Sequence, residues 1–571
     1  MLKRMWHYIR QYRRLLWTAV LAALIGGGFG LLTPMAVGRG IDYIVDRGNV
    51  DFTALIRILF LLAAFYLISG LLQWVVPLCA NRMSYGTVAA LRKDAFCKLN
   101  ALPLRYFDTQ KHGDIMSRIT NDIDNIADGL TQSMTQLFTG VVTIAGTLVI
   151  MFILNPYVAL VVLFVTPLSI LAARFIARRS AAMFQAQQNR VGELNGYAEE
   201  MISSQRIVKA YGLEKDAAEA FGRINGELYK VGQKAQFYSS LVNPSTRLIN
   251  HICYISVGVL SACFAARGGG MTIGGIASFL TYATQFAKPI NEIAGVATQL
   301  QNAIASAARV FDLLDAREES PEPADMPKLH AEAGAVAFDS VRFSYVPEKP
   351  LITGLSLTVR PDQVVAVVGP TGAGKTTLVN LLMRFYDVNS GSISIDGTNI
   401  AAVTRDSLRT SFSMVLQDTW LFTGTIRENI AYGRPDAAME EIVEAAKASH
   451  AHSFIKRLPE GYDTVIQGSG GDLSQGQQQL LTIARAMLMD PPMLIFDEAT
   501  SSVDIRTEQY IQRAFRKMMT GRTSFVIAHR LSTIRHADLI LVMKDGDIVE
   551  TGTHETLLAQ GGLYTALYNS R

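Results

Sequence analysis

Six long apolar segments in the N-terminal half of the chain restrict its fold more than any other feature. They lie at about 16–38, 55–80, 136–154, 157–177, 249–267 and 272–296, and glycines and small polar residues interrupt the last two. Because an α-helix rises about 1.5 Å per residue, about 20 apolar residues cross the hydrocarbon core of a bilayer. The chain is 49% hydrophobic and only 18% charged, which is more apolar than an average soluble protein. We therefore expect an all-α, six-helix transmembrane domain.

Lys and Arg are concentrated on one side of this topology. The N-terminus and the long segments at about 81–135 and 178–248 carry most of them, whereas the connections near 42–51, 155–156 and 267–270 carry few. The positive-inside rule then places both termini and both long segments in the cytoplasm, in a multi-pass protein of a bacterial-type cytoplasmic membrane. Both long segments have helical patterns, so we expect the spanning helices to extend well beyond the bilayer.

The first residues, MLKRMWHYIRQYRRLL, alternate basic side chains with Met, Trp, Ile and Tyr. This pattern is typical of a helix that lies in the membrane interface, in contact with lipid. A cleaved signal peptide is the alternative. It is less favoured because the following apolar stretch is longer than a signal h-region and further spans follow it.

Net charge and cysteine spacing argue against two other classes of protein. The net charge of +4 is too small to indicate a nucleic-acid partner. The cysteines share no CxxC or zinc-like spacing and lie in or beside apolar segments, at Cys79, Cys97, Cys253 and Cys263. We interpret them as structural thiols.

The composition changes abruptly after Leu314. The stretch AREESPEPADMPKLHAEAGA (316–335) is polar and contains prolines, as a linker does. Beyond it, short β-rich runs such as VVAVV, MLIF and LILVM alternate with helical patterns, which predicts an α/β domain with a partly parallel sheet. The expected organisation is a transmembrane domain (1–315), a linker (316–335) and an α/β domain (336–571).

A glycine-rich segment directly after VVAVV matches the phosphate-binding pattern GxxxxGK[ST]. It consists of Gly369, Pro370, Thr371, Gly372, Ala373, Gly374, Lys375 and Thr376, and Thr377 follows it. The glycines allow backbone N–H groups to surround phosphates at the N-terminus of the helix that comes next. Lys375 is expected to neutralise charge on the β- and γ-phosphates, and the Thr376 hydroxyl to hold Mg²⁺.

A second motif, MLIFDE (493–498), ends an apolar strand in two carboxylates. Asp497 is suited to hold the metal, and Glu498 beside it to polarise the attacking water. Buried strands that end in acids are common, so the pair is weak evidence alone. Downstream of a P-loop, it predicts that the domain binds and hydrolyses a nucleoside triphosphate.

The stretch LSQGQQQ (473–479) would by itself predict only a loop and a helix start, with Ser474 as the N-cap. It lies about 100 residues after Lys375 and just before DEAT, and it resembles the LSGGQ signature of the ATP-binding cassette (ABC) family. The resemblance implies that the signature binds ATP held by a partner chain. The signature residues are Leu473, Ser474, Gln475, Gly476 and Gln477.

Further residues agree with this resemblance. It implies that Tyr345 stacks on adenine, that Gln417 is the Q-loop residue that reaches the metal and the water, and that His529 is the switch histidine. Residues 501–504 (SSVD) resemble the D-loop. Each residue type alone is common in packing or on surfaces, so their order and spacing relative to the P-loop carry the argument.

The membrane half extends the resemblance to essentially the whole chain, because six spans ahead of such a domain resemble an ABC exporter half-transporter. Residues 102–124 and 208–221 resemble the intracellular loops that couple to the ATPase domains, and 425–433 resembles the segment that meets those loops. Ordinary cytoplasmic helices are the alternative for both loops.

In this family two ATPase domains pair head to tail, so each ATP lies between the P-loop of one chain and the signature of the other. This chain has glutamine, glutamine and leucine where the family usually has glycine, arginine and arginine, at Gln475, Gln478 and Leu480. The Gln475 side chain stands where backbone should approach phosphate, and two cations are lost. An irregular signature beside a complete P-loop side resembles one half of a heterodimeric exporter. A homodimer, with a harmless glutamine, is the alternative.

The spans contain few ionisable groups, namely Arg247, His251, Lys288 and Glu292 near the inner ends of the last two. A largely apolar path suggests amphipathic or hydrophobic substrates, drug-like or lipid-like. An importer with the exporter fold and an ATP-gated channel or regulator remain alternatives, although a regulator would more naturally lack Glu498. A soluble ABC ATPase acting on DNA or ribosomes would require that the spans do not insert.

Overall fold

The computed structural model describes residues 2–46, 49–267, 271–416, 419–468, 471, 473–497, 504–527 and 534–569. The chain divides into two compact units. The membrane unit comprises Met1–Ala101 and Gln110–Ala316, and the ATPase unit comprises Leu102–Thr109 and Arg317–Arg571. A short piece of the N-terminal half therefore belongs to the ATPase unit.

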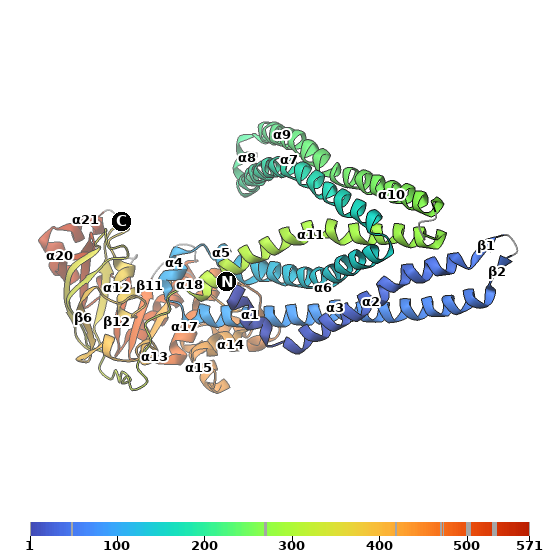
Figure 1. The fold of residues 1–571 in the computed structure, drawn as a ribbon. Helices are drawn as coiled ribbons and strands as arrows, with labels where there is room; N and C mark the ends of the chain where they lie inside the picture. Colours follow the sequence, from blue (N-terminus) through green and yellow to red (C-terminus); the bar gives the residue numbers. More distant parts are fainter. Residues whose placement is uncertain are drawn as a thin grey trace. The chain divides into compact units, whose positions relative to one another are not determined.

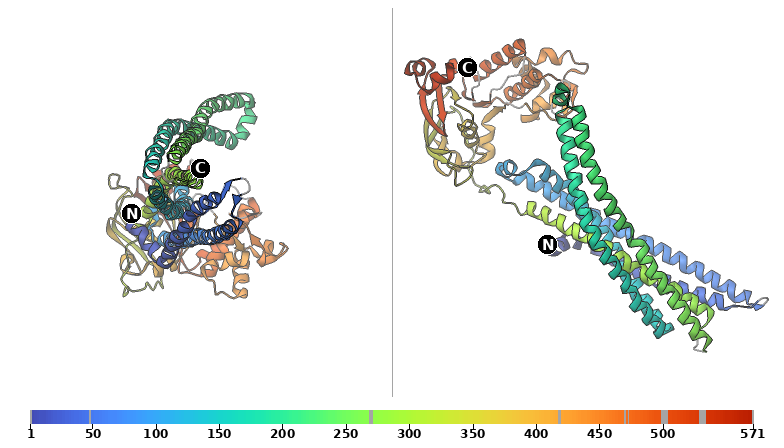
Figure 2. Two further views of the ribbon diagram at one scale, coloured as in Figure 1. Left: turned by 45° about the vertical axis from the view of Figure 1, so that its right-hand side comes forward. Right: turned by 90° about the horizontal axis from the view of Figure 1, so that it is seen from above.

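The membrane unit is almost entirely helical (Figure 1). Its elements are α1 (Leu2–Arg10), α2 (Arg13–Asp42), β1 (Ile44–Asp46), β2 (Asn49–Val50), α3 (Phe52–Ala101), α5 (His112–Ser117), the π-helix η1 (Arg118–Asp122), α6 (Ile123–Leu154), α7 (Pro156–Ser203), α8 (Gln205–Tyr211), α9 (Glu214–Ser240), α10 (Val242–Ala266) and α11 (Ile273–Leu314). Helix α2 packs along α3, α6 packs along α11, and α7 packs against α9 and α10. Figure 2 shows α7 and α9 diverging from α2 and α3 at the end away from β1 and β2.

Within the described residues, 5 continuous helical stretches are long and apolar enough to cross a membrane. They are Arg13–Asp42, Phe52–Ala101, His112–Leu154, Pro156–Ser203 and Glu214–Ala266. The four longest have 43 to 53 residues, or about 65–80 Å of helix, which confirms that the spanning helices extend beyond a bilayer. The sixth predicted span lies in α11, but α11 is not among these 5 stretches. Its Thr, Gln, Lys and Glu side chains reduce its hydropathy, and they line cavities described below.

Close backbone approaches hold α11 against α2 at the end near β1. A Cβ atom on Gly38 would lie 2.4 Å from the carbonyl oxygen of Gly274, so the two helices meet where neither has a side chain. The buried Tyr282 hydroxyl donates to the carbonyl of Leu31 at 2.5 Å, and Ser278 donates to the carbonyl of Pro34 at 2.8 Å. Such bonds between helices satisfy polar groups that a membrane would leave unpaired.

The ATPase unit has a six-stranded, mostly parallel sheet in the order β14-β13-β5-β12-β11-β8 and a four-stranded antiparallel sheet in the order β4-β3-β6-β7. The strands are β3 (Val336–Phe343), β4 (Ile352–Val359), β5 (Val364–Val368), β6 (Ser390–Ile395), β7 (Thr398–Asn399), β8 (Phe412–Val415), β9 (Gly424–Thr425), β10 (Val465–Ile466), β11 (Met493–Asp497), β12 (Thr523–Ile527), β13 (Leu539–Lys544) and β14 (Asp547–Gly552). The helices that concern the site are α4 (Leu104–Thr109), α12 (Lys375–Leu382), α14 (Ile426–Ile430), α15 (Met439–Ala448), α17 (Gln475–Met489) and α18 (Ile505–Met519). The predicted fold class, a helical membrane domain followed by an α/β domain, is confirmed.

The parallel strands are buried on both faces, and their alternating side chains separate two cores. Val365 and Val367 of β5 share one core with Leu378 of α12. Ala366 and Val368 share the other core with Leu481 of α17. Helices α12 and α17 therefore cover opposite faces of the same sheet.

Part of the segment predicted as a linker is packed rather than extended. The Arg405 guanidinium, whose side chain is only 7% exposed, pairs with Glu322 at 3.1 Å. Asp396 accepts bonds from the backbone N–H groups of residues 332–335. Burial alone would raise the pKa of Asp396, but these four N–H groups lower it below the usual value. This ionised carboxylate fixes the chain just before β3.

Candidate functional site

The P-loop and the predicted metal-binding aspartate lie at one edge of the six-stranded sheet. Strands β5, β12 and β11 are adjacent and parallel, with Val367 opposite Ile527 and Ile527 opposite Asp497. The carboxyl ends of parallel strands meet at the same edge, which is where ligands bind in open α/β sheets. The geometry thus brings Asp497 to the edge from which the P-loop leaves β5.

The conformation of the P-loop depends on its glycines. Gly372 and Gly374 have φ angles of 82° and 94°, which few other residues adopt without strain. A Cβ atom on Gly369 would lie 2.3 Å from the carbonyl oxygen of Met543, at the end of β13. The loop is also tied to the turn between β13 and β14 through a bond from the N–H of Gly546 to the carbonyl of Ala373. The tight turn that the motif predicts is present.

Lys375 and two threonines start helix α12 at the end of this loop. The Lys375 ammonium donates to the carbonyls of Gly369 and Pro370 at 3.0 and 2.9 Å, so it lies across the loop. Thr376 is exposed, whereas Thr377 is buried. The backbone N–H groups of the first turn and the lysine together form a positive site that suits a phosphate chain.

Three predicted catalytic residues, Gln417, Glu498 and His529, lie outside the described residues, as do residues 501–503 of the D-loop. Their roles stay predictions. Asp504, the last residue of that stretch, caps α18 by accepting from the N–H of Thr507 at 3.0 Å. The hydrogen bonds from Thr507 lower the pKa of Asp504, which is consistent with an ionised cap.

Tyr345, the predicted adenine partner, is half-buried beside α12. Its hydroxyl donates to Thr377 at 3.2 Å and accepts from the side chain of Asn380 at 3.1 Å. Its ring contacts Phe343 and Tyr386 edge to face, with centroids 4.8 and 4.9 Å apart. These contacts fix the ring beside the first turn of the helix that carries the P-loop lysine.

The signature forms the start of α17. Ser474 is the N-cap, as predicted: its hydroxyl accepts from the N–H of Gln477 at 3.3 Å, and the Gln477 side chain accepts from the N–H of Ser474 at 2.9 Å. This is a capping box, and it leaves the Ser474 hydroxyl proton available to another acceptor. Gly476 is buried, whereas Gln475 is exposed.

Gln478, one of the departures from the usual signature, stabilises its own loop. Its amide donates to the carbonyl of Leu473 at 2.9 Å and accepts from Thr419 at 3.2 Å. An arginine at this position would carry a charge that the glutamine lacks. The irregular signature is therefore held by hydrogen bonds of its own, but it is weaker in positive charge.

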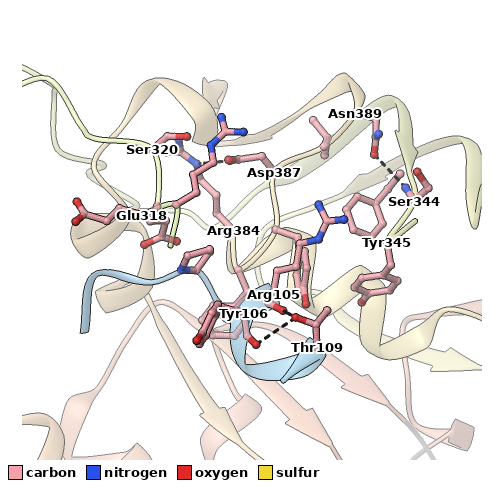
Figure 3. Close-up of a pocket in the computed structure, with 17 residues that line it drawn as sticks. Arg105, Tyr106, Thr109, Glu318, Ser320, Ser344, Tyr345, Arg384, Asp387 and Asn389 are labelled. Carbon is pink, nitrogen blue, oxygen red and sulfur yellow. Dashed lines mark hydrogen bonds and ion pairs between the residues drawn. The ribbon is translucent and has the colours of Figure 1, made fainter. Parts of the chain in front are cut away.

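Helix α4 lies in the predicted first coupling loop and packs on the ATPase unit, to which it belongs. Figure 3 shows it carrying Arg105, Tyr106 and Thr109 along a cavity of about 500 Å³ that Tyr345 and Arg384 also line. Tyr386 donates to the carboxylate of Asp108 on α4. Burial and the hydrogen bond to Asp108 raise the pKa of Tyr386, so the phenol stays protonated.

The Tyr386–Asp108 contact could not be predicted from the sequence, because no motif marks either residue. The same is true of Arg485 of α17, whose partly buried guanidinium donates to the carbonyl of Asn429 on α14 at 2.9 Å. Burial lowers the pKa of Arg485. Asn429 lies within the segment 425–433, so this polar contact, together with the apolar packing of Ile426 and Ile430, holds that segment against the signature helix. The second predicted coupling loop, 208–221, lies in the membrane unit, and its coupling role stays a prediction.

Comparison with known proteins identifies the family. Residues 16–290 match the ABC transporter transmembrane region and residues 352–501 match the ABC transporter domain. A fatty acid ABC transporter ATP-binding/permease protein of Mycobacterium tuberculosis is 49% identical over 521 residues, which cover 91% of this chain and 82% of that protein. An ATP-dependent lipid A-core flippase of Chromobacterium violaceum is 36% identical over 98% of this chain and 97% of its own. The chain belongs to the ABC transporter family.

A solved structure supports the exporter type. A bacterial Atm1-family ABC exporter with ATP bound superposes with a TM-score of 0.78, at 30% identity, over 98% of both chains. This ABC exporter half-transporter is therefore a multi-pass membrane protein. Its ATPase domain binds and hydrolyses ATP to drive export.

Proposed function

We propose that the chain exports amphipathic or hydrophobic, lipid-like molecules across the cytoplasmic membrane as one half of a two-chain exporter. The observation that carries the two-chain proposal is the position of the signature. Helix α17 and the P-loop helix α12 cover opposite faces of one sheet, so Ser474 is suited to meet ATP on another chain. The names of the fatty acid and lipid A relatives support the class of substrate.

In this proposal each ATP is held mainly by the P-loop side. Its phosphates accept from the backbone N–H groups around Gly372–Thr376 and from Lys375, and Tyr345 packs against adenine. Glu498 polarises the attacking water, and Gln417 and His529 position it and the γ-phosphate. The partner's signature supplies the Ser474 hydroxyl and the Gly476 N–H as further donors.

The predicted metal ligands also suit Mg²⁺, which prefers oxygen ligands and is bound by few protein groups. Thr376 at the start of α12 is exposed, Asp497 ends β11 at the same sheet edge, and Gln417 completes the proposed set. The ion would offset negative charge on the β- and γ-phosphates. We infer that these three residues hold it.

We infer that the partner is a different ABC half-transporter. Gln475 adds an exposed side chain at the start of α17, and the side-chain amide of Gln478 donates to the backbone of its own loop. The chain would hydrolyse ATP against the partner's regular signature, while its own signature completes a slower site. A homodimer is the alternative.

Purifying the chain expressed alone tests the choice of partner. A heterodimer predicts little ATP turnover until the partner is added. Strong turnover by the chain alone, abolished by Glu498→Gln, would overturn the heterodimer proposal and leave the homodimer.

Transport is tested in proteoliposomes that contain the assembled exporter and a fluorescent amphiphile. With both termini on the cytoplasmic side, addition of ATP to the side that carries the ATPase domains should move the amphiphile to the opposite leaflet or compartment. The Glu498→Gln protein should not do so. Movement in the reverse direction would indicate an importer, and ATP turnover with no movement a regulator.

A further inference from the structure

Two adjoining cavities in the membrane unit collect most of the ionisable side chains of the last two predicted spans. The α10 cavity, of about 490 Å³, lies between α10 and α11, and the α6 cavity, of about 230 Å³, is lined by α2, α3, α6 and α11. Lys288 and Glu292 of α11 line both. The sequence predicted a largely apolar path. The cavity walls are more polar than this prediction, because the few polar residues of separate helices line the same cavities.

The α10 cavity has a polar end and an apolar end. Arg247 and Glu292 are each 19 residues from the facing ends of α10 and α11, so each lies about 29 Å along its helix from that end. Lys288 lies about one helical turn closer to the start of α11. The apolar Cys253 and Ala283 line the cavity still closer to these facing helix ends. In the proposed orientation, the charged end is level with the inner boundary of the hydrocarbon core.

The charged end carries a net positive charge of one, from Arg247 and Lys288 against Glu292. Among the described residues, none of the three has an ion-pair partner. Lys288 precedes Glu292 by four residues, the less favourable order for a helical pair, so mutual neutralisation is weak. The amides of Asn243 and Asn250 lie on the Arg247 face of α10, and the structure records no bond for them within its described part.

The α6 cavity suits an anion less well, because Lys288 and Glu292 are the only charged residues among the described residues that line it, and their charges cancel. Thr139 and Thr143 line it, but their hydroxyls donate to carbonyls of their own helix at 2.9 and 2.8 Å. These hydroxyls therefore offer acceptors to the cavity and not donors. An oxyanion is better matched by the donors of the α10 cavity.

We propose that the α10 cavity binds the oxyanion head group of an amphipathic substrate, a carboxylate or a phosphate, through Arg247 and Lys288. The apolar tail extends past Cys253 and Ala283 toward the membrane interior. The guanidinium of Arg247 offers the paired donors that both head groups accept. This inference rests on the proposed export of amphiphiles and names the chemical class of the substrate.

Equilibrium binding to the assembled exporter in lipid nanodiscs tests the proposal, with four probes that share a 16-carbon tail. The head groups are a carboxylate, a phosphate, an alcohol and a trimethylammonium. We expect at least one oxyanion to bind about tenfold tighter than the alcohol, and the trimethylammonium to bind weakest. The carboxylate and phosphate arms distinguish a fatty acid from a phospholipid-like substrate.

Single substitutions then locate the site. Arg247→Gln and Lys288→Gln should each weaken oxyanion binding about tenfold and change alcohol binding less than twofold. Arg174→Gln is the matched control, because Arg174 lies 18 residues into α7, about 27 Å from its start, and lines neither cavity. It should leave oxyanion binding unchanged.

Equal binding of alcohol and oxyanions by the unaltered protein would overturn the head-group proposal, even if the variants failed to fold. An Arg174→Gln protein as impaired as the other two would also overturn it. If all four probes are transported alike, only this inference fails. If none is transported with ATP, the proposed export function fails instead.

Discussion

The P-loop of the ATPase unit and the α10 cavity of the membrane unit are built from different kinds of sequence. One continuous stretch, from β5 to α12, supplies the strand, the turn and the helix of the P-loop. The cavity is lined by two helices whose contributing residues are spread from 243 to 292. The first site is made largely of backbone, which a short motif specifies. The second is made of side chains that meet only when helices pack.

The largest effect on activity should come from a substitution in the ATP site, which short motifs specify. Glu498→Gln removes the proposed base, so ATP turnover by the assembled exporter should fall about 100-fold or more while ATP still binds. Turnover and nucleotide binding are measured on the same purified protein. The control is Glu460→Gln, on an exposed turn. Retention of more than a tenth of the turnover would exclude Glu498 as the base.

The second prediction concerns Asp122, a buried carboxylate of the membrane unit whose partners come from a distant part of the chain. Asp122 is 3% exposed and accepts from Arg309 Nε at 2.7 Å and from Ser306 at 3.0 Å. Burial would raise the pKa of Asp122, but the bonds from Arg309 and Ser306 prevail and lower it below the usual value of an aspartate. Asp122→Asn should reduce stability at neutral pH by about 1–3 kcal/mol, seen as a lower Tm.

The pH dependence has a definite sign. Because the folded-state pKa is lowered, the contribution of Asp122 is full above the unfolded-state pKa and is lost as the pH falls through the folded-state pKa. The Tm difference between the two proteins should therefore shrink in acid. Asp128→Asn, on the exposed face of α6, should show no such difference. A constant difference across pH would mean that the ion pair is not its cause.

The contact between Tyr386 and Asp108 tests how the ATPase unit holds helix α4. Tyr386→Phe removes one hydrogen bond and keeps the ring contact with Tyr345. We expect a loss of about 1 kcal/mol in that contact, and a two- to fivefold drop in amphiphile transported per ATP hydrolysed. Tyr229→Phe, on an exposed face of α9, serves as control. An unchanged transport ratio would mean that this bond does not carry coupling.

The smallest effect concerns the irregular signature. Gln475→Gly restores the usual glycine and removes an exposed side chain at the start of α17. If that side chain hinders approach to a partner's ATP, turnover of the assembled exporter should rise two- to fivefold, as about 0.5–1 kcal/mol would give. Gln477 should not be changed in the same protein, because it forms the capping box with Ser474. No rise would indicate that the glutamine is harmless and would favour the homodimer.

Much of the fold follows from local sequence. The positions of the spanning helices were predictable because an apolar run must match the thickness of a bilayer. The cap at Ser474 was predictable because its partner Gln477 lies one turn away. The composition of α11 already suggested a weaker span. The packed contact of Arg405 with the predicted linker was not predictable, because glutamate-rich segments usually remain solvated.

The sequence by itself determined the two kinds of domain, the P-loop with its lysine, and the departure of the signature from the family pattern. These features depend on residues close together in the chain, where chain geometry leaves little freedom. Only the tertiary structure placed α12 and α17 on opposite faces of one sheet, joined Tyr386 to Asp108, and gathered Arg247, Lys288 and Glu292 around one cavity. Those arrangements depend on how distant helices and strands pack, and side-chain packing between distant segments leaves no periodic or local trace in the sequence.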